Sequence, residues 1–179
     1  MPDLSFLITP APYHVLAYGT LLGTEFFQSF IGGVVAFKTL PRPQFSSLQQ
    51  RIFPIYFGIQ TGVPVFLALT YPGAGSTPSG IFGALAEGNR WSVLAPLALM
   101  FATGFANLAF LRPATARIMK ERKLQETKDG KRSYDPPPHS REMVKLNRAF
   151  GRVHGISSLV NLTSLIGTMW YGIALSERL

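Results

Sequence analysis

The sequence predicts an all-α integral membrane protein, a four-helix bundle that forms a single membrane domain over residues 1–179. One observation is a set of four apolar segments, Tyr13–Phe37, Ile52–Tyr71, Trp91–Leu111 and Val153–Leu175. A second is the placement of Lys and Arg, because fifteen of the seventeen lie in two of the connections between these segments. A third is the position of aromatic residues at the segment ends.

Each apolar segment is 20 to 25 residues long. A hydrocarbon core of about 30 Å requires roughly 20 residues of α-helix. Because backbone groups in lipid must be hydrogen-bonded within the protein, uninterrupted apolar runs predict helices rather than barrel strands. Helices of a soluble bundle would show a charged face, which these segments lack.

The basic residues predict the orientation. Three lie between the first two segments, and twelve lie in the connection 112–152, which has five acidic residues. Lys and Arg accumulate on the cytosolic side of a membrane. We therefore expect two basic cytosolic loops and non-cytosolic N- and C-termini. The aromatic residues that mark the predicted non-cytosolic ends agree: Tyr13, Tyr71, Trp91, Trp170 and Tyr171.

The connections have distinct characters. Pro41 and Pro43 are expected to end the first helix, and the Gly-, Pro- and Ser-rich segment Tyr71–Arg90 predicts a flexible outer loop. In the long cytosolic loop, Ala114–Thr127 has helix-forming composition. "DGKRSYDPPP" should break that helix, and Ser140 is a candidate N-cap for a helix that runs into the last span.

Composition excludes some classes of function. The net charge of +8 and the pI near 10.1 are explained by membrane topology, so no nucleic-acid partner is expected. The absence of Cys excludes disulfides, thiolate metal sites and a Cys nucleophile. Met1–Pro12 lacks Lys and Arg, so the first helix is expected to act as an uncleaved signal anchor.

Glu25 is the main functional candidate, because it lies near the middle of the first span, where an unpaired carboxylate costs several kcal/mol. Helical spacing puts His14 and Gln28 on its face, while His154, Ser158 and Asn161 share a polar stripe on the last span. Gln28, Gln60 and Asn161 are expected at one depth. These residues form a candidate polar core: Glu25, Gln28, Gln60, Asn161, His14, His154 and Ser158.

This core has two interpretations. Its polar groups can hold helices together by hydrogen bonds, or they can line a polar passage or small-ligand site. The pairs Gly19/Gly23 and Gly58/Gly62 have the spacing that permits close helix packing.

No converging metal or catalytic constellation is predicted, and no cofactor is expected. His14 and His154 lie near opposite ends of their spans, so they cannot share a metal within one chain. His154 and Ser158 are four residues apart and superficially resemble a base and a nucleophile, but no orienting group accompanies them. The long basic loop also offers a candidate contact for anionic lipids or a protein partner, formed by Lys120, Arg122 and Lys123.

Three blocks of the chain resemble the transmembrane protein 205 family of four-span eukaryotic membrane proteins, which share a domain of unknown function. The blocks are "FKTLPRPQFSSLQQRIFPIYF" (Phe37–Phe57), "HGISSLVNL" (His154–Leu162) and a looser block that starts at His14. Glu25 departs from the family's pattern, in which an uncharged polar residue is usual. The resemblance covers these family-pattern positions: His14, Leu40, Pro41, Arg42, Phe45, Gln49, Pro54, Tyr56, His154, Gly155, Ser157, Ser158 and Asn161.

The resemblance implies an endoplasmic reticulum or other secretory-system membrane. Together with the sequence, it favours a non-enzymatic membrane adaptor or scaffold. One alternative is a transporter or channel for a small solute, ion or proton that uses the polar core. Another is a membrane enzyme or cofactor carrier, with His14 or His154 as an axial haem ligand across an oligomer. The oligomeric state is left open.

Overall fold

The computed structural model describes residues 5–73 and 78–177, and within these residues the chain is helical and contains no strand. Four helices of this part are long and apolar enough to cross a membrane: Pro10–Thr39, Arg42–Leu69, Glu87–Asp129 and Arg141–Ser176. The all-α class and the four membrane-length helices are therefore confirmed. Three of these helices extend beyond both ends of the apolar segment that predicted them, whereas Arg42–Leu69 begins ten residues before its segment and ends two residues before the segment does.

The first and third long helices are built from several shorter units. The first runs through α1 (Pro10–Phe26), a π-helical turn (Phe27–Gly32) and α2 (Gly33–Thr39). The third begins with a 3-10 turn (Glu87–Asn89) and a π-turn (Arg90–Leu94). It continues through α5 (Ala95–Ala106), a further π-turn (Asn107–Leu111) and α6 (Arg112–Asp129).

The remaining helices are α3 (Arg42–Leu69), the short α4 (Gly80–Ala84) and α7 (Arg141–Ser176), with a 3-10 turn, Ser5–Ile8, before α1. Leu40 and Pro41 separate α2 from α3 and have extended ψ angles of 142° and 144°. Because a residue before proline disfavours the helical conformation, the chain turns here. The predicted break at Pro41 is confirmed.

The structure of the long basic connection agrees in part with the prediction. α6 contains the predicted helix Ala114–Thr127 and continues directly from the third span. α6 ends at Asp129, and the capping residue Gly130 has a φ of 61°, a left-handed conformation that glycine adopts without strain. Ser140 caps α7, because its Oγ accepts a hydrogen bond from the Met143 backbone N–H at 3.1 Å.

The connection between α3 and α5 is more ordered than a flexible loop. α4 lies within it, and Asn89 Nδ2 donates to Tyr71 Oη at 3.2 Å and to the Gly83 carbonyl at 2.7 Å. Residues 74–77 of the predicted loop lie outside the described residues. In the rest of the connection the buried Asn89 amide joins the Tyr71 end to Gly83.

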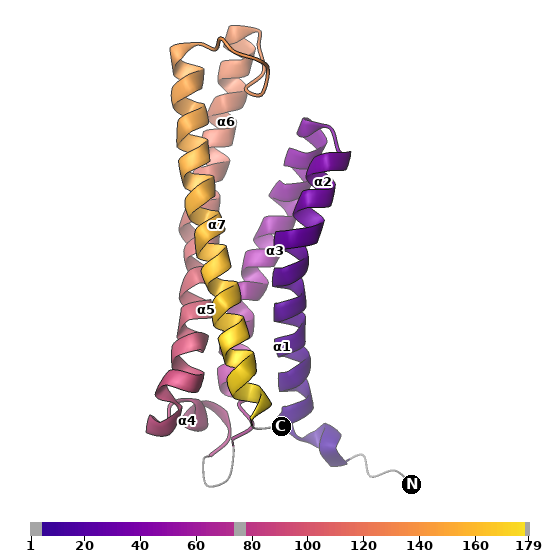
Figure 1. The fold of residues 1–179 in the computed structure, drawn as a ribbon, viewed down its shortest axis with the longest axis vertical. Coiled ribbons are helices and arrows are strands. Elements are labelled where there is room, and N and C mark those ends of the chain that lie inside the picture. The colour runs from indigo at the N-terminus through magenta and orange to yellow at the C-terminus, as the bar shows by residue number, and fades with distance from the viewer. Residues whose placement is uncertain (1–4, 74–77, 178–179) are drawn as a thin grey trace.

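The helices form a bundle that divides into two pairs toward one end (Figure 1). α3 packs on α5, α5 packs on α7, and α1 contacts α3 and α7. The start of α1, the end of α7 and α4 lie at one end, whereas the α2–α3 turn and the α6–α7 connection lie at the other (Figure 1). Both basic connections therefore share one end of the molecule.

Apolar side chains also cover the outside of the long helices. Ile55, Phe110, Leu159 and Ile173 are each 65–68% exposed. Broad apolar surfaces of this kind are rare on soluble monomers and are expected where lipid surrounds the helices. The buried apolar core lies at the α4 end and consists of Leu21, Leu67, Tyr71, Ala84, Val93, Leu97, Met100, Tyr171 and Leu175.

Candidate functional site

The most unusual feature of the bundle is a fully buried carboxyl group. Glu25, on α1, has 0% exposure. Its Oε1 accepts a hydrogen bond from Gln60 Nε2 of α3 at 2.7 Å and another from Ser164 Oγ of α7 at 2.7 Å. One carboxyl oxygen thus joins three of the four long helices.

Gln60 extends this contact toward the α2–α3 end. Its Nε2 also lies 2.9 Å from Asn161 Oδ1 and 3.3 Å from Tyr56 Oη. Tyr56 Oη donates to Asn161 Oδ1 at 2.6 Å, and Asn161 Nδ2 donates to Ser29 Oγ at 2.9 Å. We refer to these residues as the polar network: Glu25, Ser29, Tyr56, Gln60, Asn161 and Ser164.

Two oxygens of the polar network lack a hydrogen-bond partner among the described residues. They are Glu25 Oε2 and Gln60 Oε1, and both are buried. Buried polar atoms are normally hydrogen-bonded, because an unpaired one keeps its full desolvation penalty of about 1–3 kcal/mol. Both atoms are acceptors as they stand, so the network is short of a proton donor.

His14 lies in a second polar cluster, nearer the start of α1. Its Nδ1 contacts Thr70 Oγ1 at 3.0 Å and its Nε2 contacts Tyr171 Oη at 2.8 Å. Thr70 Oγ1 donates to the Phe66 carbonyl, so we infer that His14 Nδ1–H donates to Thr70 and Nε2 accepts from Tyr171. Both ring nitrogens are engaged, which leaves neither free as an axial haem ligand.

Gln28 does not reach the other two amides that the sequence placed at its depth. Gln60 and Asn161 meet directly, whereas Gln28 Nε2 donates to Gln49 Oε1 at 3.1 Å. Gln49 follows the α2–α3 turn, so this bond joins α3 to the π-turn of the first long helix. It holds together the hairpin of the first two long helices and does not contribute to the polar network.

His154 and Ser158 lie apart from the polar network. Both side chains are exposed. At this level α7 packs through Ser157, whose Oγ donates to Asn107 Oδ1 at 2.6 Å, so the adjoining face turns outward. The His154 ring stacks on Phe150, and Ser158 Oγ donates to the His154 backbone carbonyl at 2.9 Å. The hydroxyl therefore does not pair with the imidazole.

The second candidate surface is the helical hairpin that we call the α6–α7 arm, comprising α6, residues 130–140 and α7 from Arg141 to Arg152. It extends beyond the α2–α3 turn (Figure 1). Lys120 and Lys123 are exposed on it. Arg122 is partly buried instead, with its guanidinium carbon 4.5 Å from the Phe150 ring centroid, so it joins α6 to α7.

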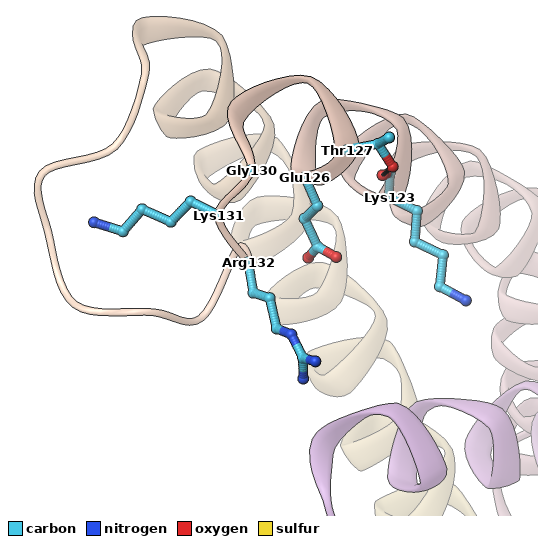
Figure 2. A pocket seen from close by; sticks show the side chains of 6 residues that line it. All are labelled: Lys123, Glu126, Thr127, Gly130, Lys131 and Arg132. Carbon is cyan, nitrogen blue, oxygen red and sulfur yellow. Dashed lines mark hydrogen bonds between the residues drawn. The ribbon is translucent and has the colours of Figure 1, made fainter.

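Figure 2 shows a depression beside the end of α6, lined by Lys123, Glu126, Thr127, Gly130, Lys131 and Arg132. Lys123 and Arg132 extend to the same side of the last turn of α6, whereas Lys131 points away (Figure 2). A hydrogen bond from Arg132 to Tyr134 Oη raises the pKa of the Arg132 guanidinium, which is fully exposed. The depression is thus bordered by permanent positive charge.

Three of the five acidic side chains of the arm bind its connection, while Glu121 and Glu142 are exposed. Glu126 Oε1 accepts from the Ser133 N–H at 2.9 Å and from the Ser133 hydroxyl. Asp129 Oδ2 accepts from Ser140 Oγ at 2.7 Å, and Asp135 Oδ2 accepts from the Arg132 N–H at 2.8 Å. These carboxylates fix the loop, while Lys120 and Lys123 remain exposed to solvent.

Sequence reasoning identified Glu25, Gln60 and Asn161 but not two of the residues that connect them. Ser29 had no signal beyond its place on the face of Glu25, one turn further along the helix. Tyr56 lies one turn before Gln60 in α3, and this spacing could have identified it as a neighbour.

Residues 16–124 match a family described as a domain of unknown function, DUF4149. A relative from Aspergillus fumigatus, "Xanthocillin biosynthesis cluster protein D", is 34% identical over 168 residues, which cover 94% of this chain and 90% of the relative. No solved structure is detectably similar to the chain.

Proposed function

The chain belongs to the DUF4149 family, and we propose that it is a non-enzymatic membrane adaptor whose α6–α7 arm binds an acidic segment of a protein partner. One observation carries the proposal: the arm extends beyond the α2–α3 turn and exposes Lys120 and Lys123, while Glu126 and Asp129 are bonded within the connection. An acidic partner would complete the charge balance of this surface.

The height of these lysines favours a protein over the bilayer that holds the chain. If the hydrocarbon edge lies near Leu111, a rise of 1.5 Å per residue puts Lys120 about 13 Å and Lys123 about 18 Å beyond it along the helix. The attraction of anionic headgroups fades within a Debye length of about 8 Å at physiological salt. Because the headgroups themselves occupy about 5–8 Å of that height, Lys123 in particular lies more than a Debye length beyond them and is better placed for a soluble partner.

The orientation of the protein and the membrane that contains it are inferred from the sequence. We place the basic connections in the cytosol and the protein in a secretory-system membrane, as the charge distribution and the resemblance to the transmembrane protein 205 family imply. The Aspergillus fumigatus relative is named for a biosynthesis cluster. An adaptor would suit such a setting by holding soluble proteins at a membrane.

The test is site-specific photo-crosslinking in cells, with a photoreactive amino acid at Thr127, which is exposed in the depression of the arm. A variant with two charge reversals, Lys120→Glu and Lys123→Glu, should give about tenfold less of the crosslinked partner. Each exposed charge pair contributes roughly 0.2–1 kcal/mol to binding, and both pairs are lost. Arg90→Glu is the matched control, because Arg90 is exposed at the opposite end of the bundle.

Equal crosslinking in the wild type and the double variant would contradict the proposal. A second measurement separates lipid from protein: binding of the reconstituted protein to added phosphatidylserine vesicles. If the double variant loses vesicle binding but keeps its crosslinked proteins, the arm binds a lipid surface and the proposed partner is wrong.

A second candidate function is transport of a small polar solute, ion or proton through the bundle. The buried carboxyl group of Glu25 favours it, since ionisable side chains inside membranes frequently mark transport pathways. Glu25→Gln should then alter flux, or its pH dependence, in proteoliposomes. The absence of flux under any imposed ion or proton gradient would exclude transport.

A further inference from the structure

We propose that Glu25 is a buried proton-binding site, in which the carboxyl group is held as the neutral acid and its proton on Oε2 completes the polar network. The proposal concerns the centre of the bundle and does not depend on what the α6–α7 arm binds. It rests on three observations: the missing counter-charge, the two unpaired oxygens and the way in which α1 is held.

No counter-charge accompanies Glu25 within the membrane. It is the only Asp, Glu, Lys or Arg in the four apolar segments. The other titratable side chains of the four apolar segments are three on the segment of α1, two on that of α3 and two on that of α7: Tyr13, His14, Tyr18, Tyr56, Tyr71, His154 and Tyr171. The apolar segment that contains α5 has none. A carboxylate without a cation in such surroundings costs several kcal/mol, whereas the neutral acid avoids most of that cost.

Hydrogen-bond accounting points to the same state. Glu25 Oε1 already accepts two hydrogen bonds, while Glu25 Oε2 and Gln60 Oε1 are acceptors without donors. One added proton converts Oε2 into a donor. Gln60 Oε1 belongs to the amide whose Nε2 already contacts the same carboxyl group, so an acid–amide pair with two hydrogen bonds would satisfy both oxygens.

The bound proton would also hold α1 in the bundle. Among its described residues, α1 buries only His14, Leu21 and Glu25. Leu21 packs in the apolar core, and the other two make the hydrogen bonds to α3 and α7 described above. An ionised Glu25 would weaken one of these few attachments, because a bare carboxylate would then lie between α1 and its neighbours.

Infrared spectroscopy of the full chain in lipid at neutral pH tests the protonation directly. A protonated carboxyl group has a carbonyl band above the amide I band, and this band should shift when H2O is replaced by D2O. It should disappear in Glu25→Gln, which keeps the shape and an N–H donor at the position of the proton. Glu142→Gln, a change at an exposed glutamate of the arm, should retain the band.

Labelling with ¹³C-glutamate gives a second measurement on the unchanged protein, in case Glu25→Gln does not fold. The label should move the band, and Glu25 is the only glutamate in the apolar segments. Absence of an acid carbonyl band from folded wild-type protein, or its persistence in folded Glu25→Gln, would overturn the proposal. So would a carboxylate band that responds to Na⁺, since a cation would then occupy the place of the proton.

Discussion

At the scale of single residues, Gln60 is the centre of the polar network. Its side chain lies within hydrogen-bond distance of Glu25 on α1, Asn161 on α7 and Tyr56 on its own helix. Hydrogen bonds between membrane helices contribute about 0.6–2 kcal/mol each, because the separated helices find other partners. Gln60 should therefore contribute more to stability than a polar residue that bonds only within its own helix.

We predict that Gln60→Leu lowers the free energy of unfolding by about 1–3 kcal/mol, since it removes one of the two donors to Glu25 Oε1 and one of the two donors to Asn161 Oδ1. Unfolding in mixed detergent micelles measures the change. Thr61→Val is the control, because the Thr61 hydroxyl donates only to the Phe57 carbonyl of α3 at 2.7 Å. Equal losses in the two variants would show that the network adds no stability of its own.

The residue scale also shows where sequence reasoning succeeded and failed. Glu25 could be singled out because a carboxyl group in an apolar segment is anomalous whatever surrounds it. His154 and Ser158 were chosen by helical periodicity, which sorts side chains onto faces but does not say which face meets another helix. Their face is exposed in the structure.

At the scale of helices, α3 and α5 approach each other closely at Gly104. A Cβ atom added at Gly104 would lie 2.7 Å from the Gln60 backbone carbonyl and 2.9 Å from the Thr61 backbone nitrogen. The small-residue pairs predicted from the sequence behave differently: nothing lies within 4 Å of a Cβ added at Gly19, Gly23, Gly58 or Gly62. Their spacing permits close packing but does not require it.

We predict that Gly104→Ala destabilises the bundle by about 1–3 kcal/mol, because the added methyl group forces two backbones apart. Gly58→Ala has open space and should leave the stability unchanged or raise it by up to about 1 kcal/mol, through the better helix propensity of alanine. Thermal unfolding of the two variants in the same detergent compares them. If Gly58→Ala is the more damaging change, its open face contacts another molecule in the membrane.

At the scale of the whole molecule, the arrangement of the ends predicts the topology. The start of α1 and the end of α7 share one end, and the two basic connections share the other (Figure 1). Positive charge at one end favours the cytosolic side for the α2–α3 turn and the α6–α7 arm.

Glycosylation sites introduced at residues 73–79 should be modified, and sites introduced at residues 127–133 should not be. Gel mobility before and after removal of the glycans provides the measurement. The reverse pattern would show that the protein has the opposite orientation in the membrane. Modification of both segments would contradict the count of four spans.

The sequence by itself determined the class of protein, the four membrane-length helices and the break at Pro41. These features depend on hydropathy, charge and proline, which act locally or add up along a segment. Only the tertiary structure decided that Glu25 meets Gln60 and Ser164, that Gln28 bonds Gln49, and that α3 and α5 approach at Gly104. Such contacts depend on the rotation and tilt of each helix, which packing against its neighbours sets.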